Sequence, residues 1–400
     1  MSQPVFIAGM GIITSIGNNL QTNLQSLEMG QTGIGKMNWL SSIHRDELPV
    51  GEVKYSNEAL ALITGLSPKI PRTALLCGIA AQEALKDAGW NERLTARTGF
   101  ISANTVGGMD KTEKFFNFFS KDPASGKLAD VVFHECGAVT ELIADYLNIR
   151  HFVSTVSTAC SSSANAIFTG ARMIREGLLD FALVGGADAL TRFTLNGFNT
   201  LMILDKDLCK PFDENRRGLN LGEGAAYLLL SSENGLQQLQ KSPYARISGW
   251  ANANDAFHQT ASSPGGTGSY LAMKGALETA AILPGDIDYI NLHGTGTQNN
   301  DIAEGTAIQK VFEGDTYPKM SSTKAYTGHT LGASGAVEAV YSVLAIQHGI
   351  IFPNLRLQTP MKEFPFHPDT ELRRNQTIRH VLSNSFGFGG NCSSLIFSAA

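Results

Sequence analysis

The sequence predicts an α/β fold built in layers, with a mainly parallel sheet covered by helices. Short apolar runs typical of strands alternate along the chain with longer stretches of helical periodicity. Residues 181–186 are continuously apolar, as expected of a strand that is covered on both faces. A second series of such elements begins near residue 245, in a similar order but with no alignable repeat. The chain therefore looks like a distant duplication.

The first series opens with a strand at residues 5–8 and a glycine-rich turn. This turn is not a dinucleotide-binding fingerprint, because Thr14 stands in the place of the last glycine. Leucines at positions 20, 24 and 27 predict a helix, and a second helix opens at residues 67–72 and ends at Gly89. A strand at residues 100–103 follows. The aromatic cluster at 115–119 predicts a core or subunit contact, with the lining of an apolar ligand pocket as the alternative.

The second series supplies strands at residues 245–249 and 289–292. It ends in a hairpin-like pair of strands at 381–384 and 395–397. Four hundred residues suit two domains or two halves of one large unit. A hydrophobic content of 43% with 17% charged residues indicates a globular protein with much buried surface. The net charge of −5 argues against nucleic acid as a bulk electrostatic partner, so an anionic partner requires a local basic patch.

The cysteines are scattered without the CxxC spacing of a zinc site or a disulfide framework, which fits a reducing cytoplasm. They are Cys77, Cys136, Cys160, Cys209 and Cys392. The N-terminus lacks a basic region, and its apolar run is far shorter than the ~20 residues that a bilayer requires. We therefore expect a cytoplasmic protein that holds no metal.

The stretch around Cys160 has the pattern of a nucleophile at a strand-to-helix junction. Residues 152–156 read as a short buried strand, and apolar residues at helical spacing follow from Cys160 onward. The unpaired N–H groups of a helix start favour a thiolate, which predicts a more nucleophilic cysteine at neutral pH. The alternative is a small buried apolar residue. The small hydroxyl residues around Cys160 leave room for a substrate and favour the nucleophile.

Three later segments supply what such a cysteine needs. His293 ends a predicted strand beside glycines and threonines, and His329 stands in a glycine-rich turn before a helix. The turn at 384–391 offers bare backbone N–H groups for a developing oxyanion. The chain contains no GxSxG elbow, no Walker A loop and no HExxH motif. Two histidines with a cysteine at a helix start are a more specific set than any one of them.

These motifs, in this order, resemble the β-ketoacyl-acyl carrier protein synthases, the elongating condensing enzymes of fatty acid and polyketide synthesis. The resemblance spans Gly9 to Phe397 and rests on residues 158–163, 293–297, 324–335 and 387–390, with 211–213 and 216–224 in support. It implies the thiolase fold, with two duplicated halves forming five α-β-α-β-α layers. The expected halves are residues 1–244, which carry the nucleophile, and residues 245–400, which carry both histidines and the Gly-Phe-Gly-Gly turn.

The resemblance also implies a role for each site residue. Cys160 would hold the acyl chain as a thioester, while His293 and His329 would stabilise the enolate formed when malonyl loses CO₂. The N–H groups of Cys160 and Phe388 would form the oxyanion hole, and the Phe388 ring would be a gate between two pockets. Further expected roles are the ordering pair Lys324 and Glu304, the pantetheine contacts Thr295 and Thr297, and the acyl-pocket residue Val106.

No metal or organic cofactor is required, because the substrates are carried on the phosphopantetheine of acyl carrier protein. Since that partner is acidic, a basic docking patch is expected, for which the resemblance points to Lys69, Arg72 and Lys210. The family is usually dimeric, so the expected assembly is a homodimer or a heterodimer with a homologous synthase or chain-length factor.

Three interpretations remain open at this point. The first is a decarboxylating condensing enzyme. The second is a thiolase or an initiating synthase, against which the two-histidine set argues. The third is a non-catalytic chain-length factor, a class that typically lacks the nucleophile present here as Cys160. The pair Asn391 and Cys392 departs from the Thr-Asn of the family and favours a specialised pathway, for instance a polyene pathway, over housekeeping fatty acid synthesis.

Overall fold

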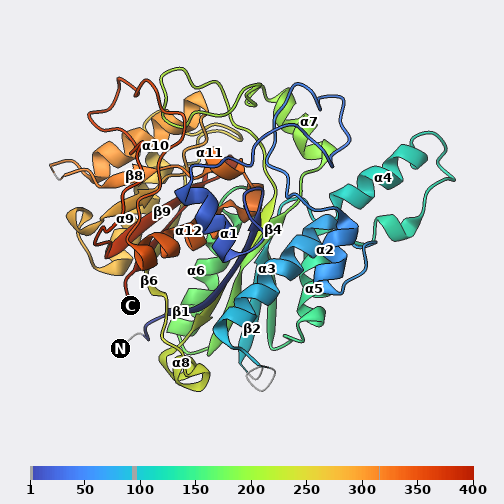
Figure 1. The fold of residues 1–400 in the computed structure, drawn as a ribbon, viewed down its shortest axis with the longest axis horizontal. Coiled ribbons are helices and arrows are strands. Elements are labelled where there is room, and N and C mark those ends of the chain that lie inside the picture. The colour runs from blue at the N-terminus through green and yellow to red at the C-terminus, as the bar shows by residue number, and fades with distance from the viewer. Residues whose placement is uncertain (1–2, 92–96, 315) are drawn as a thin grey trace.

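The computed structural model describes residues 3–91, 97–314 and 316–400, and its centre is a ten-stranded mixed sheet (Figure 1). The first five strands in spatial order are β3 (Phe152–Val156), β2 (Thr98–Ala103), β4 (Phe181–Asp188), β5 (Gly224–Ser231) and β1 (Phe6–Thr14). The other five are β6 (Ala245–Asn254), β10 (Asn391–Ser398), β9 (His380–Phe386), β7 (Tyr289–Asn291) and β8 (Lys319–Ser321).

The two sets of five strands repeat one topology. From its outer edge, the first set runs β3-β2-β4-β5-β1 and the second runs β8-β7-β9-β10-β6. Each strand number in the second set is that of its counterpart in the first plus five, so the two orders are the same. In both sets the outer pairings are parallel and the inner ones antiparallel. The sets join where β1 pairs with β6 over two residue pairs. The duplication is therefore visible in the topology, although the sheet is mixed rather than mainly parallel.

Helices separate and cover the two sets of strands in the layers expected. Helices α6 (Ser162–Arg175) and α12 (Ser334–His348) pack against each other and contact strands of both sets. Helix α3 (Arg72–Ala88) covers the first set on its outer face, and α9 (Thr267–Ala280) with α10 (Gln298–Val311) covers the second. The remaining helices are α1 (Leu20–Glu28), α2 (Asn57–Thr64), α4 (Met109–Phe119), α5 (Cys136–Tyr146), α7 (Arg192–Thr200), α8 (Glu233–Leu239) and α11 (Lys324–Thr327). The division of the chain at residue 244 stays a prediction.

The starts of α6 and α12 are in close contact, and this contact positions the site. A Cβ on Gly335 would lie 2.8 Å from the backbone nitrogen of Ala164, so only glycine lets the two helices approach this closely. The Ala336 N–H also donates to Oγ of Ser163 across 2.9 Å. The loops that precede the two helices are thereby brought together from opposite halves of the chain.

Most predicted elements are present at or near their expected places. Helix α3 ends as expected at Gly89, whose φ of +67° suits glycine. Strands β5 and β8 were not predicted from the sequence. The aromatic cluster lies on α4, which has no buried residue and stands out from the body of the molecule, so it is not part of this chain's core (Figure 1). In the described part of the chain, no helix combines the length and apolarity needed to span a bilayer.

Candidate active site

Cys160 lies on a tight turn between β3 and α6. The helix begins at Ser162 with Ser161 as its N-cap, so Cys160 precedes the first helical turn instead of belonging to it. The Ser162 hydroxyl donates to the Ala159 carbonyl at 2.6 Å and accepts from the Thr158 N–H at 2.8 Å. These two bonds close the turn, in which Ala159 has a φ of +53°. The Cys160 side chain is held in a buried position, 6% exposed.

Burial raises the pKa of the Cys160 thiol to about 11. The Lys324 ammonium and the backbone N–H groups of Phe388 and Cys160 act in the opposite direction but do not offset the loss of solvent. The expectation of a thiolate at neutral pH is therefore wrong for the unliganded protein. The thiol is protonated, and its proton has to leave during acyl transfer. The N–H groups of Cys160 and Phe388 nevertheless interact with the sulfur, where the predicted oxyanion hole would lie.

His329 is fixed by its backbone and by its ring. Its N–H donates to the Asn220 carbonyl at 2.8 Å, and its carbonyl accepts from the Gly222 N–H at 2.9 Å. The Leu331 N–H donates to the ring Nδ1 at 3.1 Å, and the Ser334 hydroxyl lies 2.9 Å from the same atom. Because Nδ1 accepts a backbone N–H, it carries no proton. The ring proton therefore sits on Nε2.

His293 presents its ring in the same tautomer. Its backbone N–H donates to one Glu304 oxygen at 2.9 Å, while the Gly294 N–H donates to the other at 2.8 Å. Its ring Nδ1 lies 3.2 Å from Nζ of Lys324, and an ammonium can only donate. Nδ1 is thus the acceptor, and Nε2 carries the proton. The two ring centroids are 5.5 Å apart in an edge-to-face arrangement.

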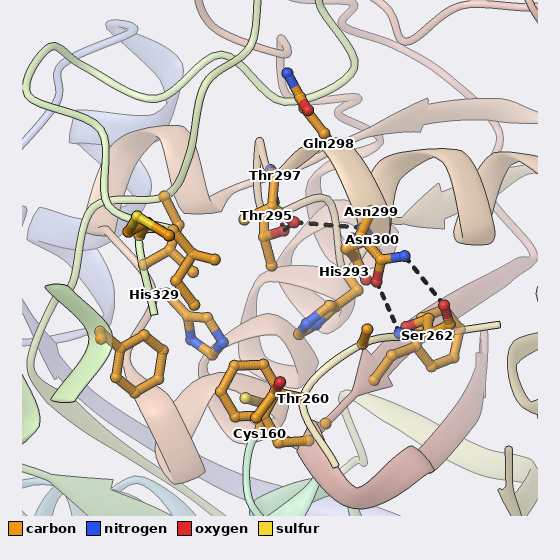
Figure 2. A pocket seen from close by; sticks show the side chains of 18 of the residues that line it. Cys160, Thr260, Ser262, His293, Thr295, Thr297, Gln298, Asn299, Asn300 and His329 are labelled. Atoms are coloured by element: carbon orange, nitrogen blue, oxygen red, sulfur yellow. Dashed lines mark hydrogen bonds between the residues drawn. The ribbon is translucent and has the colours of Figure 1, made fainter. Parts of the chain in front are cut away.

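Both imidazoles are neutral donors. Burial, with the charge of Lys324 in support, holds the pKa of His293 and of His329 well below the ordinary value. A protonated neighbouring imidazole would further oppose protonation of His293. In Figure 2 the two rings and the Cys160 side chain face a common space. The arrangement offers two N–H donors to an oxygen atom on which negative charge develops.

The predicted pairing of Lys324 with Glu304 is wrong. Lys324 forms its ion pair with Glu338 of α12, and both side chains are 2% exposed. Glu304 instead binds the backbone of the His293 loop and accepts from the Asn384 side chain at 3.1 Å. Burial raises the pKa of both carboxyl groups to about 7. Sequence reasoning missed Glu338, although it is the one charged residue in the stretch 334–347.

A cavity of about 430 Å³ contains Cys160, His293 and His329 (Figure 2). Thr295 and Thr297 line it, with their hydroxyls 2.9 Å apart, as does Phe388. The rim includes residues that the sequence did not single out. Asn299 and Ser262 exchange two hydrogen bonds of 2.7 and 3.0 Å, which tie the start of α10 to the loop after β6.

A second, more apolar cavity of about 400 Å³ lies on the other side of Phe388. Val106 lines it, as the acyl-pocket prediction requires, although its effect on chain length stays a prediction. The two cavities share Cys160, Phe198 and Phe388. The rings of Phe198 and Phe388 are stacked, with centroids 5.6 Å apart. Phe388 thus stands between the two cavities, at the place of the predicted gate.

Of the three predicted docking cations, Arg72 is in the wrong place. Its guanidinium is buried and donates to the Glu223 carboxylate at 2.7 to 3.1 Å, and also to the Tyr55 and Val53 carbonyls. It fixes the start of α3 and cannot reach a partner's surface. Lys69 is exposed and Lys210 is half-buried. Among the described residues, no group of three or more His, Cys, Asp or Glu side chains is placed to hold a metal ion.

The family model of the β-ketoacyl synthase N-terminal domain matches residues 2–234, and that of the C-terminal domain matches residues 244–358. The chain belongs to the β-ketoacyl synthase family. It is a condensing acyltransferase of the thiolase fold type, as the sequence motifs predicted. This membership favours the interpretation as a decarboxylating condensing enzyme over a thiolase.

The β-ketoacyl synthases most similar to this chain include bacterial enzymes and polyketide ketosynthases. The 3-oxoacyl-[acyl-carrier-protein] synthase 2 of Staphylococcus aureus (strain COL) is 32% identical, over 98% of this chain and 97% of the relative. The ishigamide ketosynthase/chain length factor structure matches with a TM-score of 0.94 and 29% identity over the full length of both chains. A type II polyketide ketosynthase complex with its acyl-carrier protein matches with a TM-score of 0.89 and 25% identity, again over both full chains.

Proposed function

We propose that Cys160 carries the growing acyl chain and that His293 and His329 promote loss of CO₂ from malonyl-acyl carrier protein. The product would be the 3-oxoacyl-acyl carrier protein, two carbons longer than the bound acyl chain. The supporting observation is that the three side chains, which come from both halves of the chain, line one cavity. A non-catalytic chain-length factor has no use for this arrangement.

In the first step the Cys160 sulfur attacks the thioester carbonyl of an acyl chain delivered on pantetheine. A new carbon–sulfur bond forms, the bond to the pantetheine sulfur breaks, and the thiol proton ends on the departing pantetheine sulfur. The N–H groups of Cys160 and Phe388, which interact with the sulfur, are suitably placed to stabilise the oxygen of the tetrahedral intermediate.

In the second step the malonyl thioester oxygen accepts hydrogen bonds from Nε2–H of both histidines. The bond between the α-carbon and the carboxylate breaks, CO₂ leaves, and the electron pair forms an enolate. The α-carbon then attacks the acyl carbonyl, the bond to the Cys160 sulfur breaks, and the sulfur regains a proton from solvent. Lys324 supports this step by donating to Nδ1 of His293, which keeps the donor proton on Nε2.

The two cavities suit the two substrates. The polar one, with Thr295 and Thr297 in its wall, would hold the pantetheine arm through hydrogen bonds. The apolar one, with Val106 in its wall, would hold the acyl chain. The Phe388 ring would move to let the acyl chain pass and return before malonyl enters.

We propose acyl carrier protein as the partner of Lys69 and Lys210, and a second synthase-type subunit as the partner of β3. This strand is at the edge of the sheet, and its Val153 side chain is 37% exposed. The similarity to ketosynthases solved with a chain length factor or with a carrier protein supports both partners and a polyketide or polyene pathway. We expect the protein to act in the cytoplasm.

The decisive experiment is intact-mass analysis after incubation with acyl-acyl carrier protein. The Cys160→Ala variant should remain unacylated, while the wild type and a Cys136→Ala control should gain one acyl group. Cys136 is a suitable control because it is half-buried and lies outside the two cavities.

His329→Ala should acylate normally but release no CO₂ from malonyl-acyl carrier protein. An acyl adduct on Cys160→Ala, or normal CO₂ release by His329→Ala, would contradict the proposed roles.

A further inference from the structure

Asp188, the last residue of β4, is a buried carboxyl group that takes no part in the proposed reaction steps. In the described part of the chain it accepts five hydrogen bonds, and each comes from an N–H or O–H group of Thr105, Val106 or Gly332. Burial raises the pKa of Asp188 to about 6 against the effect of these donors, so the carboxyl is ionised at pH 8. A carboxylate held by neutral donors is costly to bury, so the segments that it holds indicate its role.

The two oxygens of Asp188 have different partners. Oδ1 accepts the backbone N–H groups of Thr105 and Val106, at 2.8 and 3.1 Å. Oδ2 accepts the Thr105 hydroxyl and the Gly332 N–H, both at 2.7 Å, and lies 3.1 Å from the Thr105 nitrogen. Thr105 and Val106 follow strand β2, whereas Gly332 lies between His329 and helix α12. The carboxylate therefore ties the loop after β2 to the loop that carries His329.

Leu331, which precedes Gly332, has a backbone conformation that leucine rarely adopts. Its φ is +53°, in the left-handed region that favours glycine. Such a conformation persists only where the surrounding structure holds it. The peptide group that follows Leu331 is held by Asp188, because its N–H is that of Gly332. The N–H of Leu331 itself donates to Nδ1 of His329 at 3.1 Å. The strained residue thus connects the carboxylate to the imidazole.

Of the two described groups that contact Nδ1 of His329, the Leu331 N–H alone fixes the position of the ring proton. The Ser334 hydroxyl, at 2.9 Å, can either donate to Nδ1 or accept from it. The Leu331 N–H can only donate, so it excludes a proton on Nδ1. If the turn at Leu331 relaxed, the Ser334 hydroxyl would accommodate either tautomer.

We propose that Asp188 is a positioning residue for His329. Its carboxylate holds Gly332, and this bond keeps the turn at Leu331 in its left-handed conformation. The Leu331 N–H then keeps the imidazole proton on Nε2, so Asp188 acts on His329 through two backbone groups. The effect on turnover rests on the proposed function, because it assumes that Nε2–H of His329 is a donor in decarboxylation.

Asp188→Asn should break this relay at a single bond. The amide oxygen should take the place of Oδ1, because the two backbone N–H groups there can only donate. The NH₂ group then takes the place of Oδ2, where the Thr105 hydroxyl can turn to accept but the Gly332 N–H cannot. The matched control is Glu52→Gln, which makes the same change in another buried carboxyl group that accepts backbone N–H groups, those of residues 38–40.

Ring ¹⁵N spectra at pH 8 report the tautomer of each histidine in these variants. We expect Asp188→Asn to give His329 a mixed Nδ1–H and Nε2–H signature, while His293 keeps Nε2–H because Lys324 holds its Nδ1. CO₂ release from malonyl-acyl carrier protein should fall by about fivefold or more, and acylation by hexanoyl-acyl carrier protein by less than about twofold. Glu52→Gln should leave all three readouts as in the wild type, even where it lowers the melting temperature.

Gly332→Ala tests the same bond from its other end, and it decides the question if Asp188→Asn does not fold. The added methyl group would lie 2.7 Å from Oδ2 of Asp188, so the Gly332 N–H has to move away while the charge stays. We expect the same mixed signature of His329.

A pure Nε2–H signature of His329 in these variants, with a lowered melting temperature, would show that Asp188 is only structural and would overturn the inference. A mixed signature with CO₂ release at the wild-type rate would support the positioning role and contradict the role of His329 in the proposed function. If the wild type itself releases no CO₂ while the tautomer changes in the variants, the proposed function is wrong and the positioning role stands.

Discussion

The imidazole rings of His293 and His329 meet edge to face, and each accepts a hydrogen bond at Nδ1. This relationship leaves both Nε2–H groups free to face the cavity, although the two residues come from different loops. The donors that fix the rings are of different kinds. Lys324 fixes His293 with a side chain, whereas the Leu331 backbone fixes His329.

Both histidines should remain neutral below pH 6.5. Their pKa values are lowered in the folded protein, so between pH 6.5 and 5.5 the unfolded chain takes up protons that the folded one does not. Their contribution to stability should therefore fall as the pH drops through this window. Ring ¹⁵N chemical shifts, assigned with His293→Gln and His329→Gln, should show Nε2–H tautomers down to pH 5.5. Midpoints near pH 6.5 would contradict the burial argument.

Cys160 should react with iodoacetamide at a rate that rises with pH well beyond the ordinary thiol range. The thiolate is the nucleophile, and the thiol pKa is raised to about 11, so the rate should increase up to about that pH. Peptide mass spectrometry separates Cys160 from Cys136, which is the internal reference. A plateau of the Cys160 rate below pH 8 would mean that the helix start and Lys324 lower the thiol pKa by more than burial raises it.

Replacing one member of the Lys324–Glu338 pair should destabilise the fold by about 3 to 5 kcal/mol, because the other charge is left buried. The double variant Lys324→Met with Glu338→Met should recover most of this free energy in urea unfolding, yet release CO₂ slowly.

Burial raises the folded-state pKa of Glu338 to about 7 from 4.5, so this carboxyl makes the wild type more stable as the pH falls from 7 to 4.5. In the double variant, the part of this pH dependence of the free energy of unfolding that Glu338 causes should disappear. A double variant with full decarboxylation would remove Lys324 from the mechanism.

Phe388→Ala should uncouple decarboxylation from condensation. Loss of the ring that stacks on Phe198 opens a passage between the two cavities, so water reaches the enolate and the acyl-cysteine. The ratio of CO₂ released to 3-oxoacyl product should rise well above the value of the wild type. Phe198→Leu keeps an apolar side chain beside the gate and should change the ratio less. An unchanged ratio in Phe388→Ala would show that the ring does not separate the two steps.

Charge reversal should distinguish Lys69 from Arg72. Lys69→Glu should leave stability unchanged and raise KM for carrier-bound substrate, most clearly at low salt. Arg72→Glu should instead lower the free energy of unfolding by about 3 to 5 kcal/mol, because it leaves the Glu223 carboxylate buried without its partner. Equal KM values for Lys69→Glu and the wild type at low salt would remove Lys69 from the docking surface.

The places of Cys160, both histidines and the Gly-Phe-Gly-Gly turn could be predicted from the sequence because each stands in a local motif: small hydroxyl residues surround Cys160, and glycines lie beside the histidines and Phe388. Partnerships between distant residues could not. Arg72 has the pattern of a surface cation, yet it is buried by a carboxylate 151 positions away. Lys324 was assigned the wrong acidic partner although Glu338 is only 14 positions away, because the pairing depends on how the chain turns between α11 and α12. The pKa of Cys160 follows from how deeply the assembled halves bury the turn, which no local pattern records.

Only three described side chains border both cavities, namely Cys160, Phe198 and Phe388. A small molecule wedged at this junction would obstruct the acyl donor and the malonyl extender together. Because it would bind both the free enzyme and the acyl-enzyme, its inhibition would be mixed with respect to each substrate, and raising the concentration of one alone would not restore turnover. Compounds designed for this enzyme should therefore be built around that crossing point.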